Sequence, residues 1–110
     1  MTDLEREIRA ARNESLFRSL NERMDLVHQG ASDEERIEYF CECALPSCAS
    51  MVELSPREYE HVRMAGDRFL VMPRHVVRDI ENVLEEHSAY WIVEKVGAGS
   101  LVADALDPRA

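Results

Sequence analysis

The three cysteines of this chain, Cys41, Cys43 and Cys48, lie together in one short segment, and the 110 residues contain no others. An odd number of closely spaced thiols is more typical of a metal site than of a disulfide framework. A bound metal would also stabilise a chain that has room for only one modest core. Residues two apart on a strand point to the same face, so Cys41 and Cys43 are expected to face one way. A turn at Pro46-Ser47 would then bring Cys48 back toward them.

Zinc prefers four thiolate or imidazole ligands in a tetrahedron, so the cysteines would supply three ligands and a histidine the fourth. The chain has four histidines, His28, His61, His75 and His87. His75 is the first candidate because it follows the end of a predicted strand, and His61, within a predicted helix, is the second. Three thiolates and one histidine leave no coordination position open, which predicts a structural rather than a catalytic zinc ion.

Two other interpretations of the cysteines remain open. Free cysteines are among the most buried residue types, so the three could pack in the core as small apolar side chains. They could also form a redox pair or ligate an iron–sulfur cluster, although such clusters usually take four thiolates.

The first 30 residues predict a long amphipathic helix. Thr2-Asp3-Leu4-Glu5 has the pattern of a capping box, and Gly30 is suited to the end of the helix. Apolar residues recur mostly at spacings of three and four: Leu4, Ile8, Ala11, then Leu16 and Phe17, Leu20, Met24 and Val27. Such a helix is roughly 40 Å long, more than the width of a small domain. It could pack on its own domain, or it could dock on another protein or associate with a second copy of the chain.

Residues 36–96 predict a small α+β metal-binding domain. Alternating and β-branched residues favour strands at 37–43, 51–54, 68–72 and 89–96. Ser55-Pro56-Arg57-Glu58 predicts the start of a short helix, and Ile80, Val83 and Leu84 predict another at 79–86. Residues 97–110 are expected to form a flexible tail. The predicted fold class is α+β: a long N-terminal helix, then a small, mostly antiparallel sheet with two short helices, stapled by the metal.

The charge balance of the chain excludes several functions. Its 13 Lys and Arg against 22 Asp and Glu give a net charge of −9, which disfavours binding to a phosphate backbone. Arg6, Arg9 and Arg12 form a local basic cluster, but acidic residues are interleaved with it.

The chain lacks an apolar run of membrane-spanning length and the pattern of a secretory signal, so we expect a cytoplasmic protein that does not bind membranes. Phosphate-loop, nucleophile-elbow and zinc-protease motifs are also missing, which predicts a protein that is not an enzyme.

Several segments together resemble a family of small, uncharacterised bacterial proteins of high-GC Gram-positive genomes. They are Arg12-Asn13-Glu14-Ser15-Leu16-Phe17-Arg18 followed by Asn21-Glu22, then Phe40-Cys41-Glu42-Cys43 with Cys48, then Ser55 to Glu60, and Tyr90 to Lys95. The resemblance covers residues 12–95. In that family a histidine follows a proline-glycine step, and it corresponds to His75, with Arg74 in place of the glycine. The resemblance implies Cys41, Cys43, Cys48 and His75 as one set and brings no activity with it.

These features predict a non-enzymatic, zinc-binding regulatory or adaptor protein. Its partner would be another protein, or a second copy of the chain, bound through the N-terminal helix. The alternative is a thiol-based redox or metal sensor, because oxidation of the cysteines would release the metal. A third interpretation, a small enzyme using Glu42 or His75 beside the metal, would need an open coordination position.

Overall fold

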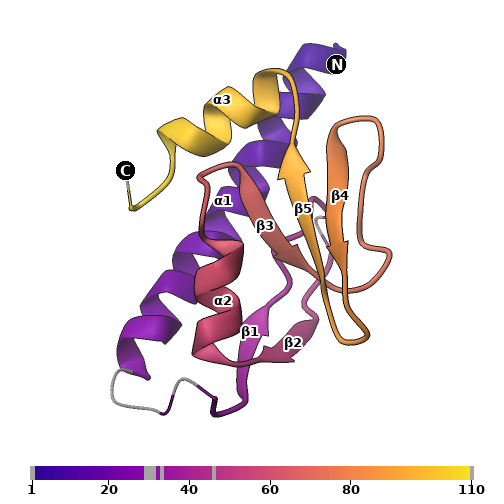
Figure 1. Ribbon diagram of the computed structural model, residues 1–110. Coiled ribbons are helices and arrows are strands. Elements are labelled where there is room, and N and C mark those ends of the chain that lie inside the picture. The colour runs from indigo at the N-terminus through magenta and orange to yellow at the C-terminus, as the bar shows by residue number, and fades with distance from the viewer. Residues whose placement is uncertain (1, 29–31, 33, 46, 110) are drawn as a thin grey trace.

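The computed structural model describes residues 2–28, 32, 34–45 and 47–109, and Figure 1 shows their arrangement. Within these residues the fold is α+β, as predicted, with a long N-terminal helix, small antiparallel sheets and two short helices. In chain order the elements are α1 (Asp3–Val27), β1 (Ile37–Phe40), β2 (Met51–Leu54), α2 (Pro56–Val62), β3 (Arg68–Val71), β4 (Glu81–Glu86), β5 (Trp91–Lys95) and α3 (Ala98–Ala105). Gly30 and Pro46, at a predicted helix end and a predicted turn, lie outside the described residues.

The first two helices begin where the capping patterns predict. Thr2 caps α1, because its hydroxyl accepts a hydrogen bond from the Glu5 amide at 3.1 Å. Ser55 and Glu58 make both hydrogen bonds of a capping box at the start of α2, with Pro56 in the first turn. Local sequence alone therefore determines where these two helices start.

The strands form two antiparallel sheets that share one core. β1 pairs with β2, with Ile37 opposite Leu54, and β5 lies between β3 and β4 in the other sheet. The buried apolar residues of the sheets and α2 include Tyr39, Val52, Leu54, Tyr59, Val62, Phe69, Leu70, Val71, Ile92 and Val93. Cys41 and Cys43 belong to the same cluster, so the cysteine segment is continuous with the core.

Helix α1 runs along the longest dimension of the molecule, which measures 44 × 28 × 23 Å. At 1.5 Å per residue its length is about 38 Å. The short helix α3 packs across the N-terminal half of α1, and strand β1 contacts α1 nearer its C-terminal end (Figure 1). Among the described residues, α1 included, we find no helix with an apolar stretch long enough to cross a bilayer.

The face of α1 that packs on the protein is not the predicted apolar stripe. Of that stripe only Ala11 is buried, whereas Leu4, Leu16 and Val27 are exposed. The other buried residues of the helix are polar: Glu14, Ser15, Arg18 and Asn21. The stripe therefore does not mark the most buried face of the helix, which is attached by hydrogen bonds and ion pairs, while Phe17 of the stripe packs on Phe40 with ring centroids 6.2 Å apart.

Arg18 illustrates how a polar side chain is accommodated inside. Its side chain is fully buried, and its guanidinium donates to the backbone oxygens of Gly66 and, at 2.8 Å, Ala103. The same guanidinium lies over the Phe69 ring, 4.6 Å from its centroid. Burial lowers the pKa of Arg18, and neighbouring Arg63 lowers it further. Carbonyl dipoles and an aromatic face replace the water that this cation loses on folding.

A buried ion-pair network joins α1 to β4 and β5. The Lys95 ammonium lies 2.8 Å from a carboxylate oxygen of Glu14 and 3.3 Å from one of Glu81, and all three side chains are 0% exposed. Glu81 also accepts a hydrogen bond from the Val77 amide at 2.8 Å. Burial raises the pKa of Glu14 well above its usual range, and the charge of Glu81 acts in the same direction. Two carboxyl groups thus share one cation in the interior.

The predicted helix at 79–86 is wrong, because residues 81–86 form strand β4. β4 pairs with β5, and the register shifts between Val83 and Glu85. This irregularity, together with the charged residues Glu81 and Glu85 on the less exposed side, hides the alternation that marks a strand. What remains visible in the sequence is the helix-like spacing of the apolar residues.

The predicted flexible tail is also wrong, because residues 98–105 form helix α3. Gly97, which has φ of +62°, turns the chain out of β5 into this helix. A Cβ on Gly99 would lie 3.6 Å from the Glu7 backbone oxygen and 3.8 Å from the Ala11 side chain, so the two helices approach closely there. Further along, Arg109 forms an ion pair with Glu60 at 2.7 Å, which attaches the C-terminal segment to α2.

Candidate metal centre

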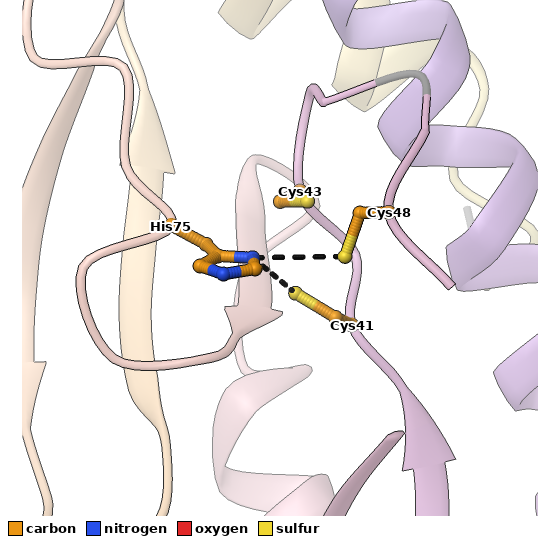
Figure 2. A group of neighbouring side chains, drawn as sticks. All are labelled: Cys41, Cys43, Cys48 and His75. Carbon is orange, nitrogen blue, oxygen red and sulfur yellow. Dashed lines mark hydrogen bonds between the residues drawn. The ribbon is translucent and has the colours of Figure 1, made fainter. Parts of the chain in front are cut away.

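The four predicted ligands come from three loop segments beside the core. Cys41 and Cys43 directly follow β1, Cys48 precedes β2, and His75 lies between β3 and β4. Figure 2 shows His75 pointing from its loop toward the thiols. Backbone hydrogen bonds hold the segments, including Cys41 N to Ser50 O at 3.0 Å and His75 N to Met72 O at 3.0 Å.

The loop that presents His75 contains an unusual backbone conformation. Arg74 has φ of 72°, in the left-handed region that favours glycine. A glycine at this position would adopt the same conformation without a steric cost. Arg74 nevertheless allows the turn, and His75 reaches the cysteines.

The ligand atoms of Cys41, Cys43, Cys48 and His75 all lie within 4.8 Å of one another. His75 Nδ1 is 3.6 Å from the sulfur of Cys41 and 3.6 Å from that of Cys48 (Figure 2). With Zn–S and Zn–N bonds of ordinary length, the sulfur–nitrogen edge of a tetrahedron is about 3.6 Å. A single proton on Nδ1 cannot point at both sulfurs, so hydrogen bonding alone explains the arrangement poorly. The geometry is consistent with a metal such as zinc.

Hydrogen bonding favours a thiolate at Cys43, and burial opposes it. Cys41 and Cys43 are each 1% exposed, and Cys48 is half-buried. A hydrogen bond with Cys41, followed by contributions that include the Leu45 amide, lowers the pKa of Cys43 to about 5. The same hydrogen bond, with burial, raises the pKa of Cys41. The Met72 amide donates to the Cys41 sulfur at 3.1 Å. Because the thiolate is the form that binds metal, the site already stabilises one ligand in its binding form.

Glu42, between two of the cysteines, is fully buried and connects the site to the rest of the protein. Its carboxylate accepts hydrogen bonds from Asn21 at 2.7 Å, from the Tyr59 hydroxyl at 2.8 Å and from the Leu70 amide at 2.9 Å. Burial raises the pKa of Glu42, and these three bonds oppose the shift. The cysteine segment is therefore attached through one side chain to α1, α2 and β3.

Asn21 makes the connection to α1 in both directions. Its amide nitrogen donates to the Phe40 oxygen at 2.8 Å as well as to Glu42, and its oxygen accepts from the Phe40 amide at 2.7 Å. Sequence reasoning missed Asn21 and Glu42 as supports of the site. For Glu42, strand alternation could have indicated this role, because Glu42 belongs to the face opposite the one that carries Cys41 and Cys43.

The other histidines lie away from this cluster. His61, the second candidate for the fourth ligand, and His87 both contact the carboxylate of Glu85 through their Nε2 atoms. His28 caps the C-terminal end of α1. Among the described residues, the structure therefore places His75, and not His61, beside the thiols.

Comparisons of the chain with models of protein families, with curated proteins and with solved structures find no match. The resemblance noted in the sequence therefore stays a prediction, and the function has to be argued from the site itself.

Proposed function

We propose that this chain is a small zinc-binding protein in which the ion is structural, and that it acts as a regulatory or adaptor module by binding another protein. The observation that carries the first part is the cluster of Cys41, Cys43, Cys48 and His75, with two sulfur–nitrogen separations of 3.6 Å. Three soft thiolates and one imidazole are the ligands that zinc prefers.

The proposed role of the zinc is to hold the fold together. Four protein ligands complete a tetrahedron and leave no place for water or substrate, so we propose a protein without enzymatic activity. The ion would join the two ends of the β1–β2 connection to the loop after β3. Because these segments are short and irregular, metal–ligand bonds would replace much of the apolar packing that holds loops in larger domains.

Protein binding through α1 is supported by the exposed side chains of that helix. Leu16 is 60% exposed, Leu26 63% and Val27 80%, on a helix whose inner face is polar. Apolar side chains arranged in this way on a helix suit contact with a second protein. A partner protein, rather than nucleic acid or a membrane, fits the net charge of −9.

The experiment that tests the structural zinc is substitution of one ligand. Cys43→Ser removes a thiolate, and the loss should approach the binding free energy of the whole site, on the order of 10 kcal/mol, so that the chain unfolds. If the thiols were merely packed in the core, the change would cost about 1–3 kcal/mol. Unfolding is measured by circular dichroism with and without a strong zinc chelator. Chelation should unfold the wild type and leave the variant unchanged, whereas a wild type indifferent to the chelator would contradict the proposal.

A thiol-based sensor is the second candidate, favoured by the position of Cys48. This thiol is only half-buried, and its sulfur lies within 4.8 Å of the other ligand atoms, so an oxidant could reach it first. Two thiolates would lose two electrons to peroxide and form a disulfide, the peroxide would take up two protons and leave as water, and zinc would be released. A chromogenic chelator measures this release. Peroxide that neither oxidises the thiols nor frees zinc would exclude the sensor.

A further inference from the structure

The outward side of α1 carries a concentration of positive charge that the sequence conceals. In the sequence, Arg6, Arg9 and Arg12 alternate with glutamates. In the structure these charges do not simply neutralise one another. Glu14 points inward and pairs with Lys95, and Arg6 pairs with Asp79. Arg9, Arg12 and Arg23 are exposed and have no ion-pair partner among the residues that the structure describes. Free guanidinium groups therefore line the outside of this helix in a chain whose net charge is −9.

The residues on this side follow the spacing of a helix–helix seam. We call them the outer face of α1. Its members are Glu5, Arg9, Arg12, Leu16, Ser19, Arg23 and Leu26. Their separations alternate between four and three residues, which keeps them on one line along the helix and is the spacing with which helices pack against each other. Two leucines can anchor a partner, and three arginines outnumber the single glutamate.

Two hollows border this face on either side of Arg12. One, of about 340 Å³, is lined by Glu5, Ile8, Arg9 and Arg12. The other, of about 230 Å³, is lined by Arg12, Ser15, Leu16, Ser19 and Leu106, where α3 ends beside α1. Ser15 is 4% exposed, and its hydroxyl lacks a hydrogen-bond partner within the described part of the chain. The second hollow thus combines an apolar wall, a guanidinium and an unpaired hydroxyl.

We propose that the outer face of α1 binds an acidic amphipathic helix of a partner protein. Carboxylates on the partner would pair with Arg9, Arg12 and Arg23, and its apolar side chains would pack on Leu16 and Leu26. A second copy of the chain fits poorly, because an antiparallel pairing centred on Leu16 brings Arg9 opposite Arg23. Nucleic acid fits poorly because the chain as a whole carries a net charge of −9. This inference rests on the proposed protein-binding function and defines the chemistry of the partner.

A labelled synthetic peptide tests the inference directly. The probe is a fluorescein-labelled helix of about three heptads with leucine at the seam and glutamate beside it, and the comparison peptide carries lysine in place of glutamate. Fluorescence anisotropy measures binding to the zinc-loaded full chain. We expect the acidic peptide alone to bind, and Arg12→Glu to weaken binding about tenfold or more. The matched control is Arg78→Glu, an equal change of charge at an exposed residue that does not belong to the outer face of α1, which should leave binding within about twofold.

Three results would overturn the inference: no binding of the acidic peptide, equal effects of Arg12→Glu and Arg78→Glu, or tighter binding of a labelled DNA duplex. Thermal unfolding verifies that both variants fold, which we expect because both arginines are exposed. Immobilised wild type and both variants, incubated with cell extract, separate this inference from the proposed function. If the wild type and both variants retain a protein equally, the inference about the outer face is wrong but the proposed protein binding stands. If none of the three retains a protein, the proposed protein binding is itself contradicted.

Discussion

Substitution of Asn21 by alanine should loosen the attachment of α1 to the cysteine segment. Asn21 is fully buried and makes three hydrogen bonds of 2.7–2.8 Å, two with the Phe40 backbone and one with Glu42. A neutral hydrogen bond contributes about 1 kcal/mol, and one to a charged group about 1.5–3 kcal/mol. The truncation also leaves the Phe40 peptide and a Glu42 oxygen without these partners. We therefore expect a loss of about 3.5–5 kcal/mol in the free energy of unfolding.

The assay is urea unfolding of the zinc-loaded protein, with the melting temperature as a second readout. For a chain of this size, about 4 °C of melting temperature corresponds to 1 kcal/mol, so the expected decrease is about 14–20 °C. The matched control is Asn82→Ala on β4, because that side chain is exposed and its loss should change stability by less than about 0.5 kcal/mol. Zinc content should stay the same in both variants, since neither residue is a proposed ligand. A decrease below about 1 kcal/mol for Asn21→Ala would refute the reasoning.

Two further predictions concern the buried ion pairs and helix α3. Burial raises the pKa of Glu14 in the folded protein above its value in the unfolded chain. The protonated side chain therefore stabilises the fold at pH values below the pKa of the unfolded chain, and this stabilisation is lost as the pH rises through the pKa of the folded protein. Glu14→Gln, which cannot ionise, should therefore gain stability relative to the wild type as pH rises in urea titrations, and a pH-independent difference would contradict this. Gly97→Ala should cost about 1–3 kcal/mol, because Gly97 has φ of +62° and ψ of −141°, a region open almost only to glycine. Ala98→Gly is its control for helix propensity, and a Gly97→Ala variant as stable as the wild type would be inconsistent with this turn.

The parts of the fold that follow local rules could be predicted from the sequence. Thr2 and Ser55 start helices because their side chains bond amides three residues ahead, an interaction that depends on no distant residue. The clustering of three cysteines was also visible, since it needs only a short segment and one turn. The choice of His75 over His61 drew on a strand end and on a resemblance, and the structure brings that histidine to the thiols.

The buried side of α1 could not be predicted because it depends on distant partners. Arg18 and Asn21 are buried only because Ala103, Phe40 and Glu42 provide hydrogen-bonding groups at the correct positions. A rule that places apolar residues inside does not select these polar positions. β4 was misassigned for a related reason, since a charged residue such as Glu81 becomes an inward residue only when Lys95 lies across from it.

Helix α3 was missed because its sequence signals are those of a linker. Gly97-Ala98-Gly99 usually separates elements, but here the small residues allow α3 to approach α1 at Ala11. A glycine that permits close packing and a glycine that permits disorder look alike in one sequence. Only the presence of the neighbouring helix distinguishes them.

The central claim, that Cys41, Cys43, Cys48 and His75 bind a structural zinc ion, is tested most directly by elemental analysis of the full chain purified without an affinity tag. We expect one zinc ion per chain, lost together with the fold when a strong chelator is added. Protein that contains no metal, yet unfolds cooperatively at the same temperature with and without chelator, would contradict it.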